Sequence, residues 1–258
     1  MTIVQRKFRV DSLWVQVYNS EAEMAEDAAD IAAKYLGEVL QQNRTARLML
    51  ATGNSQLKFL DALISNSNLD WSKIECFQLD EYLGLSSDHA ASFRRYLRDR
   101  ISSRVTPKAF HYIEGDTLEP LKECDRYSRL LQEQPIDLCL LGIGDNGHLA
   151  FNDPDVADFR DPHTVKLVRL DDINRKQQVV TAYFSDVSRV PQYAFTVTIP
   201  VICAAKKIIC LAPGQRKTEI IQYMLEAKIS EKCPASILRQ QPQATLFLDT
   251  EAAKKLSQ

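Results

Sequence analysis

The sequence predicts an α/β fold in which a doubly wound, mostly parallel sheet carries helices on both faces. Apolar, strand-like runs alternate with segments of helical spacing along the chain, which is typical of parallel sheets covered on both sides. The run at residues 136–141 is apolar apart from Asp137, as expected of a strand that is buried on both faces. No repeat, low-complexity tract or linker interrupts the pattern, so we expect residues 1–258 to form a single domain.

Each element is predicted from its periodicity and from the residues at its ends. Ser20 and Glu23 form a capping box, which starts a long amphipathic helix that runs to about Gln42. Further helices are expected at residues 56–64, 92–102, 117–134 and 216–226. Strands are expected at residues 14–18, 47–51, 74–79, 136–141, 164–170, 194–199, 207–212 and 244–249.

The composition is that of a chain with one substantial core. Of 258 residues, 45% are hydrophobic and 26% are charged. A formal net charge of -2 creates no field that would attract nucleic acid or an anionic membrane surface. The six cysteines form no CxxC pair, so we expect free thiols rather than disulfides or a metal site. Without a signal peptide or an apolar stretch long enough to span a bilayer, we expect a cytoplasmic protein.

The loop at residues 142–154 is the strongest candidate for a reaction site. It follows the buried strand at 136–141, and parallel sheets bind ligands at the carboxyl ends of their strands. It combines a histidine, two carboxylates, two amides and a central glycine: His148, Asp145, Asp153, Asn146, Asn152 and Gly147. A glycine-rich loop with a hydrogen-bonded histidine needs no ligand, but this density of polar groups favours a functional site.

A second loop, residues 52–55, joins a predicted strand to a predicted helix. The hydroxyl groups of Thr52 and Ser55, with the backbone N–H groups at the helix N-terminus, can bind a phosphate. The glycine spacing and the Lys-Ser/Thr pair of a nucleotide-binding P-loop are absent, so no nucleotide is implied. As an isolated segment, an ordinary strand-to-helix turn explains this loop equally well.

Two adjacent carboxylates, Asp80 and Glu81, follow the strand at residues 74–79. A carboxylate in such a position can transfer protons if burial raises its pKa toward the working pH. Taken alone, a pair of ordinary turn or helix-initiating acids is the commoner explanation. Three predicted strands in succession end in polar loops, however, which favours one shared site at this edge of the sheet.

In this order, the loops resemble those of the glucosamine-6-phosphate deaminase/isomerase family, which includes galactosamine-6-phosphate isomerases and, more distantly, 6-phosphogluconolactonases. The resemblance rests on Ala-Thr-Gly-Asn-Ser at 51–55, Leu-Asp-Glu-Tyr at 79–82, the GxGxxGHxAFN loop at 142–152 and Gly-x-x-Lys at 214–217. Each motif alone is weak. The four together, in this order, are specific, and the resemblance covers nearly the whole chain.

The resemblance implies an enzyme that converts glucosamine 6-phosphate, or a close epimer, to a ketose 6-phosphate and ammonia, with no cofactor or metal ion. His148 would move a proton between the ring oxygens and open the sugar. Asp80 would take the proton from C2 and return it at C1, because a carboxylate shielded from water is a usual base for a carbon acid. The phosphate would lie in the loop formed by Thr52, Gly53, Asn54 and Ser55, with Lys217 supplying positive charge.

Two positions around the histidine depart from the family pattern. Where deaminases carry an aspartate that orients the histidine, this chain has Asn146, and where they carry a glutamate it has Asp153. We expect both to act together with His148. Since an amide cannot supply the negative charge that stabilises a histidinium, either His148 is a weaker base here or Asp145 or Asp153 supplies that charge.

Three further residues are expected to contact the substrate through the same resemblance. An arginine that helps to hold the phosphate in deaminases aligns with Gln178 here, and Arg175, one helical turn away, could replace it. Glu81 and Gly147 complete the expected set of substrate-binding residues.

Two other functions stay open. A 6-phosphogluconolactonase hydrolyses an ester and needs no base at C2, and its relatives usually carry Asp-Glu-Arg where this chain has Tyr82 at the third position. A sugar-phosphate-binding regulator without catalysis is made credible by Asn146, although binding alone requires neither Asp80 nor His148. Arginines on the helix at 92–102 could pair with acids or contact another subunit, so a homo-oligomer is one option.

Overall fold

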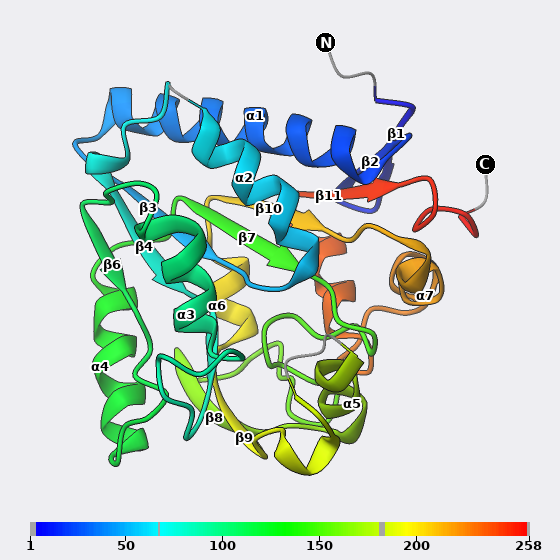
Figure 1. Cartoon of the computed structure of the whole chain (residues 1–258). Coiled ribbons are helices and arrows are strands. Elements are labelled where there is room, and N and C mark those ends of the chain that lie inside the picture. Colours follow the sequence, from blue (N-terminus) through cyan, green and yellow to red (C-terminus); the bar gives the residue numbers. More distant parts are fainter. Residues whose placement is uncertain (1–3, 67, 181–183, 257–258) are drawn as a thin grey trace.

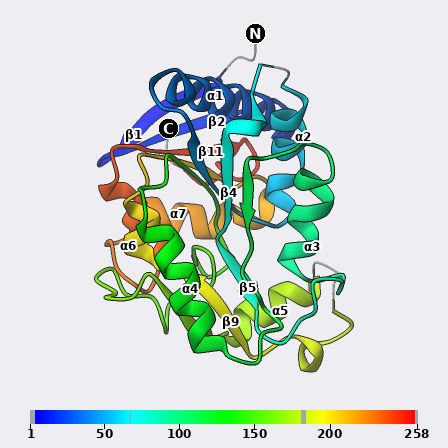
Figure 2. The ribbon, with the colours of Figure 1, turned by 90° about the vertical axis from the view of Figure 1, so that its left-hand side faces the viewer.

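A central eight-stranded sheet with helices on both faces forms the body of the protein (Figures 1 and 2). The computed structural model describes residues 4–66, 68–180 and 184–256. The strand order is β1-β2-β11-β10-β7-β3-β4-β6, and every pair is parallel except β1 with β2. In this order the strands are β1 (Arg6–Val10), β2 (Leu13–Tyr18), β11 (Ala244–Asp249), β10 (Lys207–Leu211), β7 (Leu138–Gly142), β3 (Ala46–Leu50), β4 (Ile74–Gln78) and β6 (Ala109–His111). The predicted fold class is therefore confirmed.

Helices cover the sheet from both sides. One face carries α1 (Glu21–Gln42), α2 (Leu57–Ser65) and α3 (Phe93–Leu97), and the other carries α4 (Pro120–Gln132), α6 (Ile199–Cys203) and α7 (Thr218–Glu226). The long first helix begins as predicted, because the Ser20 hydroxyl accepts a hydrogen bond from the N–H of Glu23 at 3.2 Å. Within the described ranges, none of the helices combines the length and the apolar character needed to cross a bilayer.

Strand β10 shows why the central strands are apolar at consecutive positions. Ile208 and Cys210 pack into the core beneath α4, α6 and α7, whereas Ile209 and Leu211 pack into the core beneath α1 and α2. Successive side chains of a strand point to opposite faces, and here both faces are covered. An uninterrupted apolar run is therefore required.

Two of the predicted strands do not belong to the parallel sheet, and this part of the prediction is wrong. The segments expected at 164–170 and 194–199 form β8 (Val165–Arg169) and β9 (Tyr193–Val197), which pair antiparallel with each other and with β5 (Asp80–Tyr82). Their order is β5-β9-β8. Apolar alternation indicates a strand but does not specify its partner, which long-range packing decides.

The second sheet changes the setting of the expected carboxylate pair. Asp80 and Glu81 were expected in a loop, but the chain continues from β4 almost directly into β5. Asp80 lies opposite Thr196 of β9. The pair therefore lies on a hydrogen-bonded strand, which restricts its movement. The remaining helix, α5 (Asp172–Val180), lies beside this smaller sheet (Figure 1).

Candidate active site

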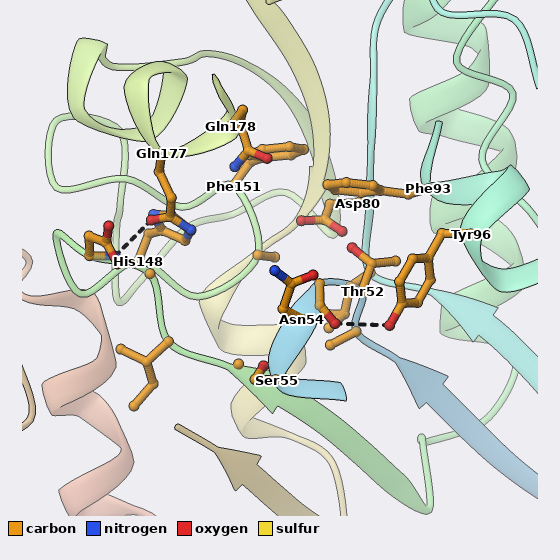
Figure 3. Close-up of a pocket in the computed structure, with 18 of the residues that line it drawn as sticks. Thr52, Asn54, Ser55, Asp80, Phe93, Tyr96, His148, Phe151, Gln177 and Gln178 are labelled. Atoms are coloured by element: carbon orange, nitrogen blue, oxygen red, sulfur yellow. Dashed lines mark hydrogen bonds between the residues drawn. The ribbon is translucent and has the colours of Figure 1, made fainter. Parts of the chain in front are cut away.

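A pocket of about 330 Å³ opens at the carboxyl ends of the adjacent strands β10, β7, β3 and β4. Parallel strands place these ends at one edge of the sheet, so loops that are far apart in the sequence converge there (Figure 3). The residues predicted for the site that line the pocket are Thr52, Gly53, Asn54, Ser55, Asp80, His148 and Lys217. Of the other predicted residues, Asn146 and Asp153 lie behind His148, and Glu81, Gly147 and Arg175 lie outside the lining.

The loop after β3 contributes the start of a helix to the pocket. Gly53 adopts a φ of 101°, a conformation that favours glycine, and Asn54 begins a short turn that leads into α2. The carbonyl of Gly53 accepts a hydrogen bond from the Tyr96 hydroxyl at 2.9 Å (Figure 3). The first N–H groups of a helix have no partner within it, so this turn is suited to bind an anion.

Asp80 is a buried carboxyl at the wall of the pocket. Only 7% of its surface is exposed. Burial raises its pKa well above the ordinary value, and the charge of Glu81 acts in the same direction. The neighbouring wall is apolar, with the rings of Phe93 and Phe151 stacked 5.6 Å apart. A shielded carboxyl of this kind is suited to transfer a proton.

Glu81 does not line the pocket, which corrects the expectation that it contacts the substrate. Successive side chains of β5 point to opposite faces, so Glu81 points away from the face that carries Asp80. Its carboxylate accepts hydrogen bonds from the N–H groups of Phe93 at 3.1 Å and Arg94 at 2.8 Å, and from the Ser92 hydroxyl at 2.9 Å. Glu81 therefore anchors the beginning of α3.

His148 is oriented by an amide and a carboxylate. Its Nδ1 lies 2.7 Å from Asn146 Oδ1 and 3.1 Å from Asp153 Oδ1. The Asn146 amide nitrogen donates to Asp153 at 3.0 Å and to Asp171 at 2.8 Å, so the amide oxygen must face the histidine. This arrangement places the proton of the neutral ring on Nδ1 and leaves Nε2 as an acceptor.

Of the two alternatives for the negative charge, the structure places Asp153 at the histidine. The Asp153 side chain is fully buried and accepts a hydrogen bond from the Asn174 amide at 2.9 Å. Burial acts to raise its pKa, but hydrogen bonds and charge from His148, with the amides of Asn146 and Asn174, outweigh burial and lower the pKa. No motif in the sequence singles out Asn174, which reaches this cluster from α5.

Asp145 pairs with the cations instead. Its carboxylate contacts Lys217 Nζ at 2.7 Å and also binds the guanidinium of Arg216. Burial acts to raise the Asp145 pKa, but the two cations outweigh it and lower the pKa. Burial lowers the pKa of Lys217, although the charge of Asp145 opposes this. The positive charge expected for a phosphate is therefore partly neutralised by a carboxylate at the same wall of the pocket.

Arg175 does not reach the pocket, which corrects its expected role. Its guanidinium donates to the carbonyls of Val187 at 2.6 Å and Val190 at 3.2 Å. The side chains that α5 does contribute to the lining are Gln177 and Gln178. Gln178, the position at which the resemblance led us to expect an arginine, therefore contributes an amide to this pocket.

Gly147 is needed by the backbone rather than by a ligand. Its φ is 84°, and a Cβ atom at this position would lie 2.7 Å from Cys233 Sγ. Because it does not line the pocket, its expected contact with the substrate is corrected to a turn that directs His148. The aromatic side chains of Phe93 and Phe184, which also line the pocket, were not among the residues predicted for the site.

Comparisons with known proteins identify the relatives of this chain. The family model described as glucosamine-6-phosphate isomerases/6-phosphogluconolactonase matches residues 19–247. A glucosamine-6-phosphate deaminase of an Exiguobacterium species is 34% identical over 238 residues, which cover 92% of this chain and 91% of the relative. The corresponding enzyme of Clostridium acetobutylicum is 35% identical over 244 residues, which cover 92% and 98%.

Solved structures show the same relationship. A structure described as a monomeric glucosamine-6-phosphate deaminase matches with a TM-score of 0.85 and 33% identity, covering 93% of this chain and 98% of that one. The 6-phosphogluconolactonase of Trypanosoma brucei matches with a TM-score of 0.77 at 17% identity, covering 94% and 98%, and shares the fold. From its motifs, its fold and these matches, the chain belongs to the glucosamine-6-phosphate isomerase/6-phosphogluconolactonase family.

Proposed function

We propose that this protein is a glucosamine-6-phosphate deaminase, which converts an amino-sugar phosphate to a ketose 6-phosphate and ammonia. The observation that carries the proposal is the buried carboxyl of Asp80, with its raised pKa, in one pocket with an oriented His148. The relatives that are 34% and 35% identical, both named glucosamine-6-phosphate deaminases, support it.

The phosphate would bind at the loop of Thr52, Gly53, Asn54 and Ser55. This loop offers hydroxyl groups and the N–H groups of a helix start, and Lys217 lies at the wall of the same pocket. Lys217→Ala should therefore weaken binding of the sugar phosphate much more than it slows the chemical step. Unchanged affinity in this variant would overturn the assignment.

The reaction would begin with ring opening at His148. With the proton on Nδ1, the Nε2 atom can accept a proton from the anomeric hydroxyl and deliver it to the ring oxygen. The buried Asp153 would stabilise the charged ring during this transfer. Asn146 would hold the ring in its tautomer.

Asp80 would then carry out the carbon chemistry. Its carboxylate takes the proton from C2 of the open aldose, which leaves an enolamine, and the proton is returned to C1. The resulting C2 imine adds water and releases ammonia, so that one water is consumed for each ketose formed. The apolar wall around Asp80 excludes solvent and strengthens the base.

A lactonase is less well supported. The 6-phosphogluconolactonase of Trypanosoma brucei is only 17% identical to this chain, whereas the solved deaminase structure is 33% identical.

One assay separates the candidates. The purified protein is incubated with glucosamine 6-phosphate, galactosamine 6-phosphate and 6-phosphogluconolactone, while ammonia, ketose and acid are measured. We expect ammonia and ketose in equal amounts from an amino-sugar phosphate. Acid from the lactone, or no turnover with retained binding, would overturn the proposal.

We further propose that the protein acts as a monomer in the cytoplasm. The pocket is built from loops of a single chain, and a solved relative that is 33% identical is described as monomeric. Light scattering on the purified protein tests the assembly state, and a stable oligomer would contradict this part of the proposal. Cell fractionation tests the compartment.

A further inference from the structure

The fully buried side chain of Gln56 lies next to the loop proposed to bind the phosphate. Gln56 is 0% exposed and does not line the pocket, whereas its neighbour Ser55 does (Figure 3). The amide nitrogen of Gln56, Nε2, donates to the carbonyl of Leu141 at 3.1 Å and to the hydroxyl oxygen of Ser55 at 3.1 Å. Gln56 therefore joins the loop after β3 to the end of β7.

The Leu141 carbonyl determines which way the Gln56 amide faces. A carbonyl only accepts hydrogen bonds, so the nitrogen of the amide, and not its oxygen, must lie beside it. Among residues 4–66, 68–180 and 184–256, none forms a hydrogen bond with the amide oxygen. An apolar side chain would fill the same space without burying an unpaired oxygen, so the reason for an amide at this position lies in its two N–H groups.

The hydrogen bond from Gln56 determines in turn what the Ser55 hydroxyl can do. A hydroxyl has one proton to donate and two lone pairs that accept. Because an amide nitrogen only donates, Ser55 must accept from Gln56, and its own proton must point elsewhere. The space beside the hydroxyl is narrow as well, since a Cβ atom at Gly142 would lie 3.1 Å from Ser55 Oγ. Ser55 is thus held at the pocket with its proton directed away from Gln56.

We propose that Gln56 is a positioning residue whose amide directs the Ser55 hydroxyl to donate its proton to the phosphate group of the substrate. The inference rests on the proposed function, because it requires that a phosphate binds at residues 52–55. A phosphate dianion offers only acceptors, so a hydroxyl that is already oriented as a donor loses less freedom when the ligand binds. Gln56 touches no ligand and acts only through Ser55.

The test is a double-mutant cycle on the affinity for inorganic phosphate. Ser55→Ala should weaken binding on the order of tenfold, as expected for one hydrogen bond to a charged group. Gln56→Met keeps the length of the side chain but removes its donors, and should weaken binding about fivefold. In the Ser55→Ala background, Gln56→Met should change the affinity by less than about twofold, because the hydroxyl through which it acts is gone. Titration calorimetry measures the four proteins.

Gln243 provides the matched control. Its amide nitrogen donates to the carbonyl of Cys203 at 2.8 Å, and it directly precedes β11, at the opposite edge of the sheet from the pocket. Gln243→Met should lower the melting temperature, because a hydrogen bond is lost, and should leave the affinity for phosphate unchanged. Gln56→Asn is the second test variant. It keeps the amide on a side chain that is one carbon shorter, so it should lose the contact with Ser55 and reproduce the weaker binding of Gln56→Met.

The outcomes separate this inference from the proposed function. If the wild-type protein binds neither inorganic phosphate nor glucosamine 6-phosphate, the proposed function fails and this inference fails with it. If the wild-type protein binds phosphate and releases ammonia from glucosamine 6-phosphate, while both Gln56 variants bind phosphate with unchanged affinity, the inference alone is overturned. An equal loss from Gln56→Met in the wild-type and Ser55→Ala backgrounds would show that Gln56 supports the loop without directing the hydroxyl, and would also overturn it.

Discussion

Burial of Asp80 favours its proposed role as a base but lowers the stability of the folded protein. Burial and the charge of Glu81 raise its pKa above the ordinary value of 3.8, so the folded protein holds a proton that the unfolded chain releases. The contribution of this group to stability is complete below the unfolded pKa and is lost as the pH rises through the folded pKa. A buried base therefore lowers the stability of the protein at the pH where it works.

The variant Asp80→Asn should show both effects. We expect its melting temperature to exceed that of the wild-type protein at neutral pH, with the gain disappearing toward about pH 4, where the unfolded aspartate also holds its proton. Exchange of the C2 proton with solvent should fall on the order of 10²–10⁴-fold. Thermal melts across this pH range and deuterium incorporation followed by NMR are the measurements.

The exposed Asp125 provides the control for these melts, because Asp125→Asn should produce no comparable gain that depends on pH. Persistent C2 exchange in Asp80→Asn would show that another group carries the proton. The mechanism proposed for this pocket would then be wrong.

Asp145 determines how much positive charge the pocket offers. It contacts Lys217 at 2.7 Å and pairs with Arg216, so a bound phosphate dianion meets two cations and one carboxylate. Asp145→Asn should tighten binding of inorganic phosphate on the order of tenfold, because a repulsive charge is removed. It should also destabilise the free protein, because the mostly buried Lys217 loses its counter-charge.

Calorimetric titration with phosphate, at constant ionic strength, measures this effect. Lys217→Ala is the matched variant and should change the affinity in the opposite direction. Weaker phosphate binding in Asp145→Asn would mean that the carboxylate orients Lys217 for the ligand rather than competing with it.

At the scale of elements, the turn between β7 and His148 depends on backbone geometry. Gly147→Ala should destabilise the protein by about 1–3 kcal/mol, since it forces a side chain into the left-handed region. The added Cβ would also lie 2.7 Å from Cys233 Sγ. Gly37→Ala is the control, because a Cβ there meets nothing within 4 Å and the position lies inside α1.

The control should stabilise the protein by about 0.5–1 kcal/mol, the difference between glycine and alanine in a helix. Denaturant unfolding of both variants gives the two free energies. Equal effects of the same sign would show that the turn at Gly147 tolerates a side chain, and its role in directing His148 would have to be given up.

At the scale of the whole molecule, the central sheet and the small sheet could unfold in one transition or in two. The chain crosses from the central sheet to the small sheet between β4 and β5, and Phe195 of β9 belongs to the main core. We expect residues 1–258 to unfold as one cooperative unit, with equal calorimetric and van't Hoff enthalpies. Two resolved transitions in a calorimetric scan would show that the small sheet forms a separate unit.

The sequence by itself determined the class of fold and the edge of the sheet at which the candidate site lies. Strands such as β10 are apolar on both faces because both faces are covered, and this pattern is local. The parallel arrangement brings the carboxyl ends of β3, β4 and β7 to one edge, so the polar loops that follow them could be predicted to meet. Asp80 and His148 were predicted to share a site in this way, and both line the same pocket.

Only the tertiary structure decided which of these groups touch. Asp145 and Asp153 are equivalent by composition, yet Asp145 pairs with Lys217 while Asp153 contacts His148. The direction of β8 and β9 and the position of Arg175 likewise depend on residues that are distant along the chain. Local patterns report the burial of a residue and its periodicity, but the partner of a charge or of a strand edge is set by packing between elements, which no local pattern encodes.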